Sequence, residues 1–142
     1  MSANALNPAY RIYVVEDSAI LLQLLVEMIG AIPRALIVGH SGRAADALDG
    51  ILNSMPDAII VDLMLKSGTG FDVLHAVSRH VANPPVAMVL TNLATGPYRK
   101  LAARLGAVHF FDKSVDIPRM VRVISKLAEE PQQRRGSNRG HG

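Results

Sequence analysis

The sequence contains no cysteine, which excludes disulfide bonds, thiolate metal sites and a cysteine nucleophile. The N-terminal residues MSANALNPAYR lack the basic and apolar segments of a secretory leader. No apolar run approaches the roughly 20 residues needed to cross a bilayer, because Glu27, Pro33 and Arg34 interrupt the longest one. We therefore expect a soluble, cytoplasmic protein without a membrane partner.

Excess charge of one sign is also scarce. The net charge of +3 comes entirely from Arg134, Arg135 and Arg139 near the C-terminus. Three arginines make too few phosphate contacts to dominate binding to DNA or RNA, so we expect them to promote solubility and do not expect a nucleic-acid partner.

The length of 142 residues fits one globular domain. We predict a flexible N-terminus over residues 1–9, a domain over 10–130 and a disordered basic tail over 131–142. The tail, PQQRRGSNRGHG, is polar and shows no periodicity.

Short apolar runs alternate with segments of helical spacing five times along the chain. The runs are rich in Val and Ile, as in strands covered on both faces, and they are Ile12–Val15, Ala35–Val38, Ala58–Val61, Val86–Leu90 and Val108–Phe111. The helical segments are Ser18–Ile29, Gly42–Leu52, Phe71–Val81, Tyr98–Leu105 and Ile117–Ala128. Helix-boundary residues support them: Ser18 as an N-cap, Gly106 as a stop and Pro118 in a first turn. This series predicts an α/β fold with a parallel sheet, right-handed crossovers and helices on both faces.

Polar residues follow four of the predicted strands, at the sheet edge where open α/β proteins bind ligands. They are Glu16 and Asp17, Asp62, Thr91, and Lys113. Each has an ordinary structural explanation, since acidic residues cap helices, aspartate ends strands and a single lysine is usually solvated.

Together these residues indicate a functional site. Clustered carboxylates repel one another unless a cation neutralises them, and hard oxygen ligands suit Mg²⁺. A lysine and a threonine beside such an ion can hold a phosphoryl group. Asp62 is then a candidate nucleophile that forms an aspartyl phosphate.

At these residues the chain resembles the response-regulator receiver domains of two-component signalling. The matching segments are VVEDS, IIVDLML, LTN and FFDKS, with Gly70 eight residues after Asp62. The resemblance covers about residues 10 to 130 and implies a flavodoxin-like (βα)5 fold with strand order 2-1-3-4-5. It also implies that Asp62 accepts a phosphoryl group from a sensor histidine kinase or a histidine phosphotransfer protein.

The resemblance implies a role for each residue at this edge. Asp17, Asp62 and the backbone carbonyl of Met64 would ligate Mg²⁺, with Glu16 acting through water. Lys113 would pair with the phosphoryl oxygens.

Switching and water access follow from the same resemblance. Thr91 would hydrogen-bond the phosphoryl group, and Phe110 would be the aromatic that follows it in switching, although Phe110 also suits a core position. Met64 and Leu93 would control the access of water. Both are apolar and cannot orient a water molecule, so we expect slow hydrolysis of phospho-Asp62.

Three residues depart from the family pattern. Ser114 stands where a proline usually follows the lysine, so we expect the loop that positions Lys113 to differ from that of the family. Lys66 stands where a proline is frequent four residues after the acceptor. Asn92 replaces a small residue and narrows access to Asp62.

Two surfaces are candidates for partners. The first predicted helix is apolar nearly all round: Leu22, Leu25, Val26 and Ile29 are predicted to face the sheet, and Ile20, Leu21, Leu24 and Met28 to form a kinase-docking face. Coverage of that face by the protein's own loops is the alternative. The helices Tyr98–Arg104 and Ile117–Ala128 present a basic face that is either solvated or an output surface for an acidic partner or a second copy.

Only a short tail follows the predicted domain, so we expect a stand-alone regulator that acts by protein binding or onward phosphotransfer. An aspartyl phosphatase is disfavoured because Met64 occupies the position of its second aspartate. A flavin or nucleotide module is disfavoured because the first loop is Glu-Asp-Ser rather than glycine-rich or hydroxyl-rich. A degenerate receiver that binds partners without phosphorylation is disfavoured because all five site residues are present.

Overall fold

The computed structural model describes residues 8–130, so the predicted tail and most of the predicted N-terminal segment lie outside the described residues. The strands are β1 (Tyr10–Val15), β2 (Ala35–Ser41), β3 (Ala58–Val61), β4 (Val86–Thr91) and β5 (Ala107–Asp112). The helices are α2 (Ala19–Gly30), α3 (Ala44–Ser54), α4 (Gly70–His80), α5 (Gly96–Arg104) and α6 (Ile117–Glu129). The strands form one parallel sheet in the order β2-β1-β3-β4-β5, which confirms the predicted flavodoxin-like topology.

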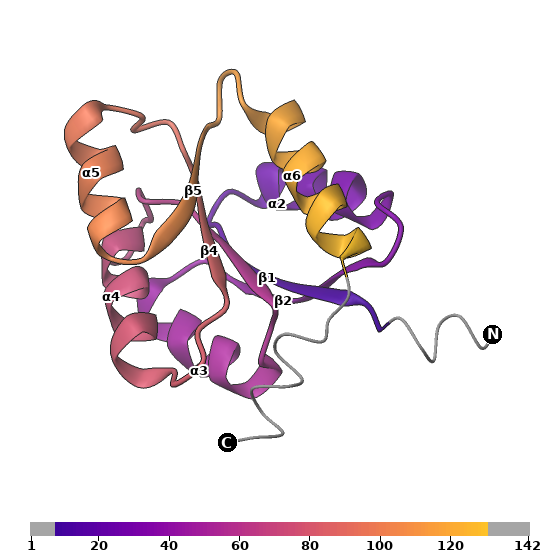
Figure 1. The fold of residues 1–142 in the computed structure, drawn as a ribbon. Helices are drawn as coiled ribbons and strands as arrows, with labels where there is room; N and C mark the ends of the chain where they lie inside the picture. Colours follow the sequence, from indigo (N-terminus) through magenta and orange to yellow (C-terminus); the bar gives the residue numbers. More distant parts are fainter. Residues whose placement is uncertain (1–7, 131–142) are drawn as a thin grey trace.

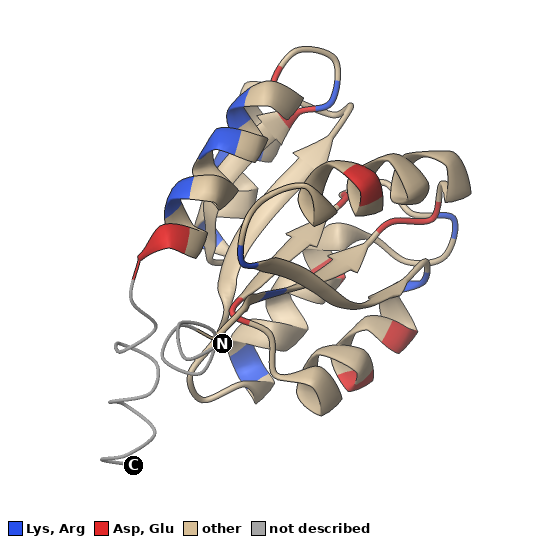
Figure 2. Cartoon of the chain, turned by 90° about the vertical axis from the view of Figure 1, so that its right-hand side faces the viewer, with Lys and Arg blue, Asp and Glu red and all other residues tan. Residues whose placement is uncertain are grey.

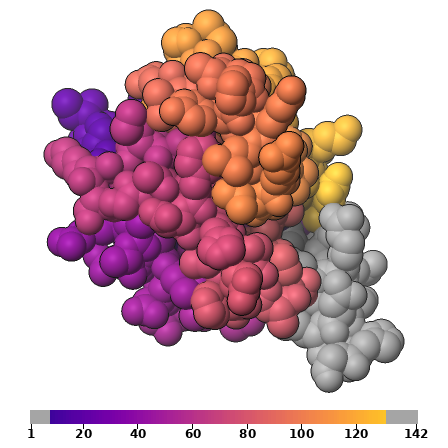
Figure 3. All heavy atoms as spheres, turned by 90° about the vertical axis from the view of Figure 1, so that its left-hand side faces the viewer, coloured from indigo at the N-terminus to yellow at the C-terminus, as the bar shows by residue number. Residues whose placement is uncertain are grey.

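Helices cover both faces of this sheet (Figure 1). Helices α2 and α6 lie on one face, and α3, α4 and α5 lie on the other. Figure 3 views the second layer from outside, where α4 and α5 make up much of the visible surface. Alternate residues of each strand enter opposite layers, since successive side chains of a strand point to opposite faces. In β1, for example, Ile12 and Val14 belong to one core cluster and Tyr13 and Val15 to the other.

The two edge strands are less covered than predicted. Strands β1, β3 and β4 are almost wholly buried, whereas β2 and β5 have partly exposed residues throughout most of their length. Leu36 in β2 is 48% exposed and Val108 in β5 is 66% exposed. Helices of both layers contact β2 and β5, but a strand at the end of the sheet order has a neighbouring strand on one side only, so these two strands are less buried than the central three.

The buried stripe of helix α2 differs from the predicted one at three positions. Leu25 and Ile29 are buried and Leu22 is partly buried against the core, as predicted, but Val26, which was predicted to face the sheet, is 45% exposed. Leu21 and Met28, predicted on the outer face, are instead partly buried against the core. Because α2 contacts α6 as well as β2, a flank of the helix is buried in addition to its sheet-facing side.

The helix ends follow local chemistry. The Ser18 side chain caps α2 by accepting a hydrogen bond from the Leu21 amide at 3.2 Å. Thr69 and Asp72 form a capping box at the start of α4. Pro118 lies in the first turn of α6, and Gly106 after α5 has a φ of +105°, as its predicted stop position requires. None of the helices in the described part of the chain combines the length and apolar character that a bilayer crossing needs.

Candidate functional site

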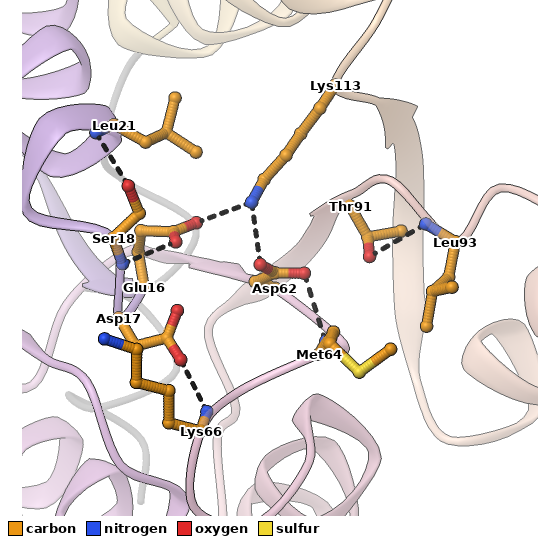
Figure 4. Close-up of polar contacts among 10 residues, drawn as sticks. All are labelled: Glu16, Asp17, Ser18, Leu21, Asp62, Met64, Lys66, Thr91, Leu93 and Lys113. Carbon is orange, nitrogen blue, oxygen red and sulfur yellow. Dashed lines mark hydrogen bonds and ion pairs between the residues drawn. The ribbon is translucent and has the colours of Figure 1, made fainter.

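The carboxyl ends of β1 and β3 bring three carboxylates together (Figure 4). Glu16, Asp17 and Asp62 each offer one oxygen within 4.8 Å of the others. The sheet's hydrogen bonding continues into these residues: the Asp62 amide donates to the Val15 carbonyl and the Glu16 amide to the Ser41 carbonyl, both at 3.0 Å. The carboxylates are therefore attached to the rigid sheet edge.

Lys113 enters this cluster from the end of β5. Its Nζ lies 2.7 Å from Asp62 Oδ2 and 3.1 Å from Glu16 Oε1, and its side chain is only 14% exposed. Burial on its own lowers the pKa of Lys113, but the bonds and charges of Asp62 and Glu16 outweigh burial and raise that pKa above its ordinary value. Lys113 is thus an ammonium that offsets part of the carboxylate charge.

Glu16 is buried, with 4% of its surface exposed. Burial raises its pKa, the hydrogen bond from the Ser18 amide at 2.9 Å and the Lys113 ammonium oppose that rise, and the charge of Asp62 adds to it. The net pKa of Glu16 is raised. Glu16 therefore holds its negative charge less readily than an exposed glutamate.

The donor set fits a magnesium ion. Three carboxylates face one ammonium, so the cluster keeps an excess of negative charge that a divalent cation would balance, and carboxylate oxygens are ligands that Mg²⁺ prefers. The loop after β3 also contacts this cluster, because Asp62 Oδ1 accepts a hydrogen bond from the Met64 amide at 3.1 Å.

Gly70 sets the approach of α4 to this loop. Its amide donates to the Leu63 carbonyl at 3.0 Å. A Cβ added at Gly70 would lie 2.3 Å from the Asp62 carbonyl oxygen and 2.8 Å from Leu63 Cα. Glycine is therefore required where α4 begins against the backbone of Asp62.

Thr91 lies at the end of β4, and Phe110 lies on the neighbouring strand β5. Thr91 is fully buried, and its Oγ1 accepts the Leu93 amide at 3.2 Å. Phe110 is partly buried, with the Arg99 guanidinium of α5 4.6 Å from its ring centre and its carbonyl accepting from Arg119 at 3.0 Å. Cations from two helices thus contact the predicted switch residue.

The two residues predicted to control water access lie on the loops at this edge. Met64 is 59% exposed and Leu93 is partly buried. Both side chains are drawn with the charged cluster in Figure 4.

The replacement of proline by Ser114 does not keep Lys113 from the cluster. Residues 8–130 contain no cis peptide bond, so the Lys113–Ser114 bond is trans. Ser114 donates twice to Asp112 Oδ1, from its hydroxyl at 2.7 Å and its amide at 2.9 Å, and these bonds lower the pKa of Asp112. The amide bond is one that proline could not make.

Sequence reasoning missed two backbone donors at the site. The Ser18 amide binds Glu16, and the Lys66 amide donates to Asp17 Oδ2. The Lys66 donor could have been suspected from the sequence, because a residue other than proline at position 66 has a backbone N–H to donate.

Comparison with known proteins identifies the family of this chain. The family model of the response regulator receiver domain matches residues 12–125. The chain is 25% identical over 122 residues to the sensory transduction protein LytT of Bacillus cereus, covering 86% of this chain and 48% of that protein. It is 30% identical over 121 residues to protein-glutamate methylesterase/protein-glutamine glutaminase 1 of Rhizobium johnstonii, covering 84% of this chain and 34% of that protein. The chain thus spans about half or less of the length of these curated relatives.

Solved structures show the same fold. The response regulator domain of Thermotoga maritima CheB superimposes with a TM-score of 0.74 at 22% identity, covering 84% of this chain and 93% of that one. The signal receiver domain of NarL from Mycobacterium tuberculosis gives 0.77 at 21% identity, covering 86% and 98%. At these identities the likeness concerns the fold alone.

Proposed function

Since the chain belongs to the family of response regulator receiver domains, whose members are phosphoacceptors, we propose that it accepts a phosphoryl group on Asp62. The donor is a phosphohistidine of a sensor histidine kinase or of a histidine phosphotransfer protein. The observation that carries this proposal is the position of the Asp62 carboxylate, which lies at the end of β3, 2.7 Å from Lys113 Nζ and within the cluster of Glu16 and Asp17.

In the transfer, a carboxylate oxygen of Asp62 forms a bond to phosphorus while the bond from phosphorus to the histidine nitrogen breaks. The electron pair stays on the imidazole, which regains a proton from water. Lys113 moves from the carboxylates toward the incoming phosphoryl oxygens and offsets their charge. Because catalysis of phosphoryl transfer is mainly positioning and charge stabilisation, no further nucleophile or base is required.

Mg²⁺ would be held by Asp17, Asp62 and the Met64 carbonyl, with Glu16 acting through water. When bound, the ion supplies positive charge for the oxygens of the transferred group. The excess of carboxylates over ammonium groups in the cluster supports this assignment.

After transfer, Thr91 would hydrogen-bond the phosphoryl group, and Phe110 would be the aromatic residue that follows Thr91 in switching. Thr91 Oγ1 accepts a hydrogen bond from the Leu93 amide, so a hydroxyl that turns to donate to the phosphoryl group would carry the β4–α5 loop with it. Met64 and Leu93 would exclude water from the phosphorylated residue and slow its hydrolysis, because neither side chain can orient an attacking water.

The kinase or phosphotransfer protein would dock on α2 around Ile20 and Leu24, which are 84% and 43% exposed. Leu21 and Met28 would lie at the margin of this surface, since both are partly buried. Exposed apolar residues in a patch are typical of protein contacts.

The output surface would be the basic face of α5 and α6. Figure 2 shows Lys and Arg along α6, and the residues of this face are all exposed: Arg99, Lys100, Arg104, Arg119, Arg122 and Lys126. An acidic protein or a second copy fits this surface. We propose that the chain acts in the cytoplasm through such binding or through onward transfer of the phosphoryl group.

The test is incubation of the purified protein with acetyl phosphate and Mg²⁺, followed by intact-mass measurement. Wild type should gain one phosphoryl group, and Asp62→Asn should gain none. Failure of the wild type to gain mass, under conditions that label another receiver domain, would refute phosphoryl acceptance.

A further inference from the structure

A backbone hydrogen bond joins the β3–α4 loop to Asp17 of the acidic cluster. The Lys66 amide donates to Asp17 Oδ2, and Figure 4 shows this bond linking the loop after β3 with the turn after β1. The Lys66 residue itself is exposed. The bond therefore depends on the backbone at position 66 and not on the ammonium group.

Contacts with residues near the start of α3 position both partners of this hydrogen bond. On the loop side, the Ala44 amide at the start of α3 donates to the Ser67 carbonyl at 3.1 Å. The loop is closed by a bridge between Met64 and Thr69. These contacts fix the direction of the neighbouring amide.

On the carboxylate side, Asp17 is packed against Gly42. A Cβ added there would lie 3.3 Å from Asp17 Cα and 3.4 Å from Asp17 Cβ. Both the loop that carries the donor and the backbone of the acceptor therefore lie against the segment that leads into α3.

A carboxylate held at one oxygen has lost rotational freedom before an ion arrives. Hydrogen bonds of this kind to metal-ligating groups change metal affinity by about 10- to 100-fold when removed. A proline at position 66 has no N–H and would leave Asp17 Oδ2 without this donor.

We propose that the Lys66 amide positions Asp17 for Mg²⁺, so that ion affinity depends on the conformation of the Leu63–Thr69 loop. The inference rests on the proposed function in requiring that the acidic cluster takes Mg²⁺. It assigns Lys66 a positioning role that a proline at this place could not have.

The test compares Lys66→Pro with Lys66→Ala, which retains the N–H and removes only the ammonium. Mg²⁺ dissociation constants are measured by ¹H–¹⁵N NMR titration of each full-length protein. We expect the proline variant to bind Mg²⁺ about ten-fold more weakly than wild type. The alanine variant should stay within about two-fold, because an exposed charge is largely screened.

A second measurement does not depend on the proline variant folding normally. Without Mg²⁺, amide hydrogen exchange at Lys66 should be at least about ten-fold faster in Asp17→Ala than in wild type. The Ala44 amide, bonded to Ser67, serves as the internal control and should keep its protection. Unchanged exchange at Lys66 would overturn the inference.

The outcomes separate this inference from the proposed function. Normal Mg²⁺ binding by wild type with equal dissociation constants for the two Lys66 variants would refute the positioning role alone. No Mg²⁺ binding by wild type would refute the metal site of the proposed function and this inference together.

Discussion

Substitution of Gly70 by alanine tests whether the start of α4 controls the geometry of the phosphoacceptor. The added Cβ would lie 2.3 Å from the Asp62 carbonyl oxygen and 2.9 Å from the Asp62 carbonyl carbon. Both atoms belong to the backbone, so no side chain can rotate away. Either α4 or the Asp62–Leu63 backbone must move by about 1 Å to restore an ordinary contact.

That displacement has two consequences. Overpacking of this kind costs about 1 to 3 kcal/mol of unfolding free energy. A 1 Å shift of reacting groups can reduce a rate by about 100-fold, and Mg²⁺ tolerates little departure from its octahedral geometry. We therefore expect Gly70→Ala to lower both stability in urea denaturation and the rate of labelling by acetyl phosphate.

Two other glycines provide matched controls. A Cβ at Gly30 meets nothing within 4 Å, so Gly30→Ala in α2 should be neutral or stabilising by up to about 1 kcal/mol. A Cβ at Gly50 would lie 2.0 Å from the Tyr13 hydroxyl, so Gly50→Ala should destabilise the α3 layer while the labelling rate of the folded protein stays near that of wild type. Wild-type stability and labelling in Gly70→Ala would refute the reasoning. So would an equal loss of labelling in Gly50→Ala under conditions where it is folded.

Further predictions concern charge, pH and water. Lys113→Met leaves buried Glu16 and Asp62 without their shared ammonium, so the unfolding free energy at neutral pH should fall by about 3 kcal/mol in urea denaturation; an unchanged midpoint would contradict this ion-pair role. Burial, and then the charge of Arg119, lower the pKa of His109 below 6.5, so the unfolded chain takes up a proton that the folded chain does not, and stability should fall as the pH drops through 6.5. His109→Gln should reduce that fall between about pH 7.5 and about pH 5.5, and an identical fall in both proteins would exclude His109 as its source. Phospho-Asp62 should hydrolyse faster in Met64→Asn, which can orient a water, than in wild type; a wild-type half-life on the order of seconds would show that Met64 and Leu93 do not exclude water.

The topology was predictable because the strand pattern, the helical pattern and the residues at the helix ends all indicate the same series of elements. Val- and Ile-rich runs of four or five residues alternate with amphipathic segments, and Ser18, Gly106 and Pro118 mark helix ends that the structure confirms. Burial along α2 was predicted less well. A helix with apolar residues nearly all round has no polar face to reveal its orientation, so its contact with α6 decides that Met28 is covered and Val26 is not.

The meeting of the carboxylates with Lys113 was also predictable, because the ends of parallel strands share one sheet edge. The backbone donors to Glu16 and Asp17 were not predicted. An amide carries no side-chain signature, and its direction depends on the loop conformation, which in the case of Lys66 is held by contacts with the start of α3. The close approach of Gly70 to the Asp62 backbone was also not predicted, because the sequence shows only a glycine eight residues after Asp62.

The position of the charged cluster at the strand ends has a consequence for evolution. Glu16, Asp17, Asp62 and Lys113 lie just beyond the ends of β1, β3 and β5, whereas the two apolar clusters are built mainly from the strands and helices themselves. A lineage can therefore lose phosphoryl acceptance through a single Asp62→Asn change, which also relieves repulsion among neighbouring carboxylates, and still inherit an intact scaffold with its surfaces. A descendant of this kind would be free to keep a binding partner after its original signal had disappeared.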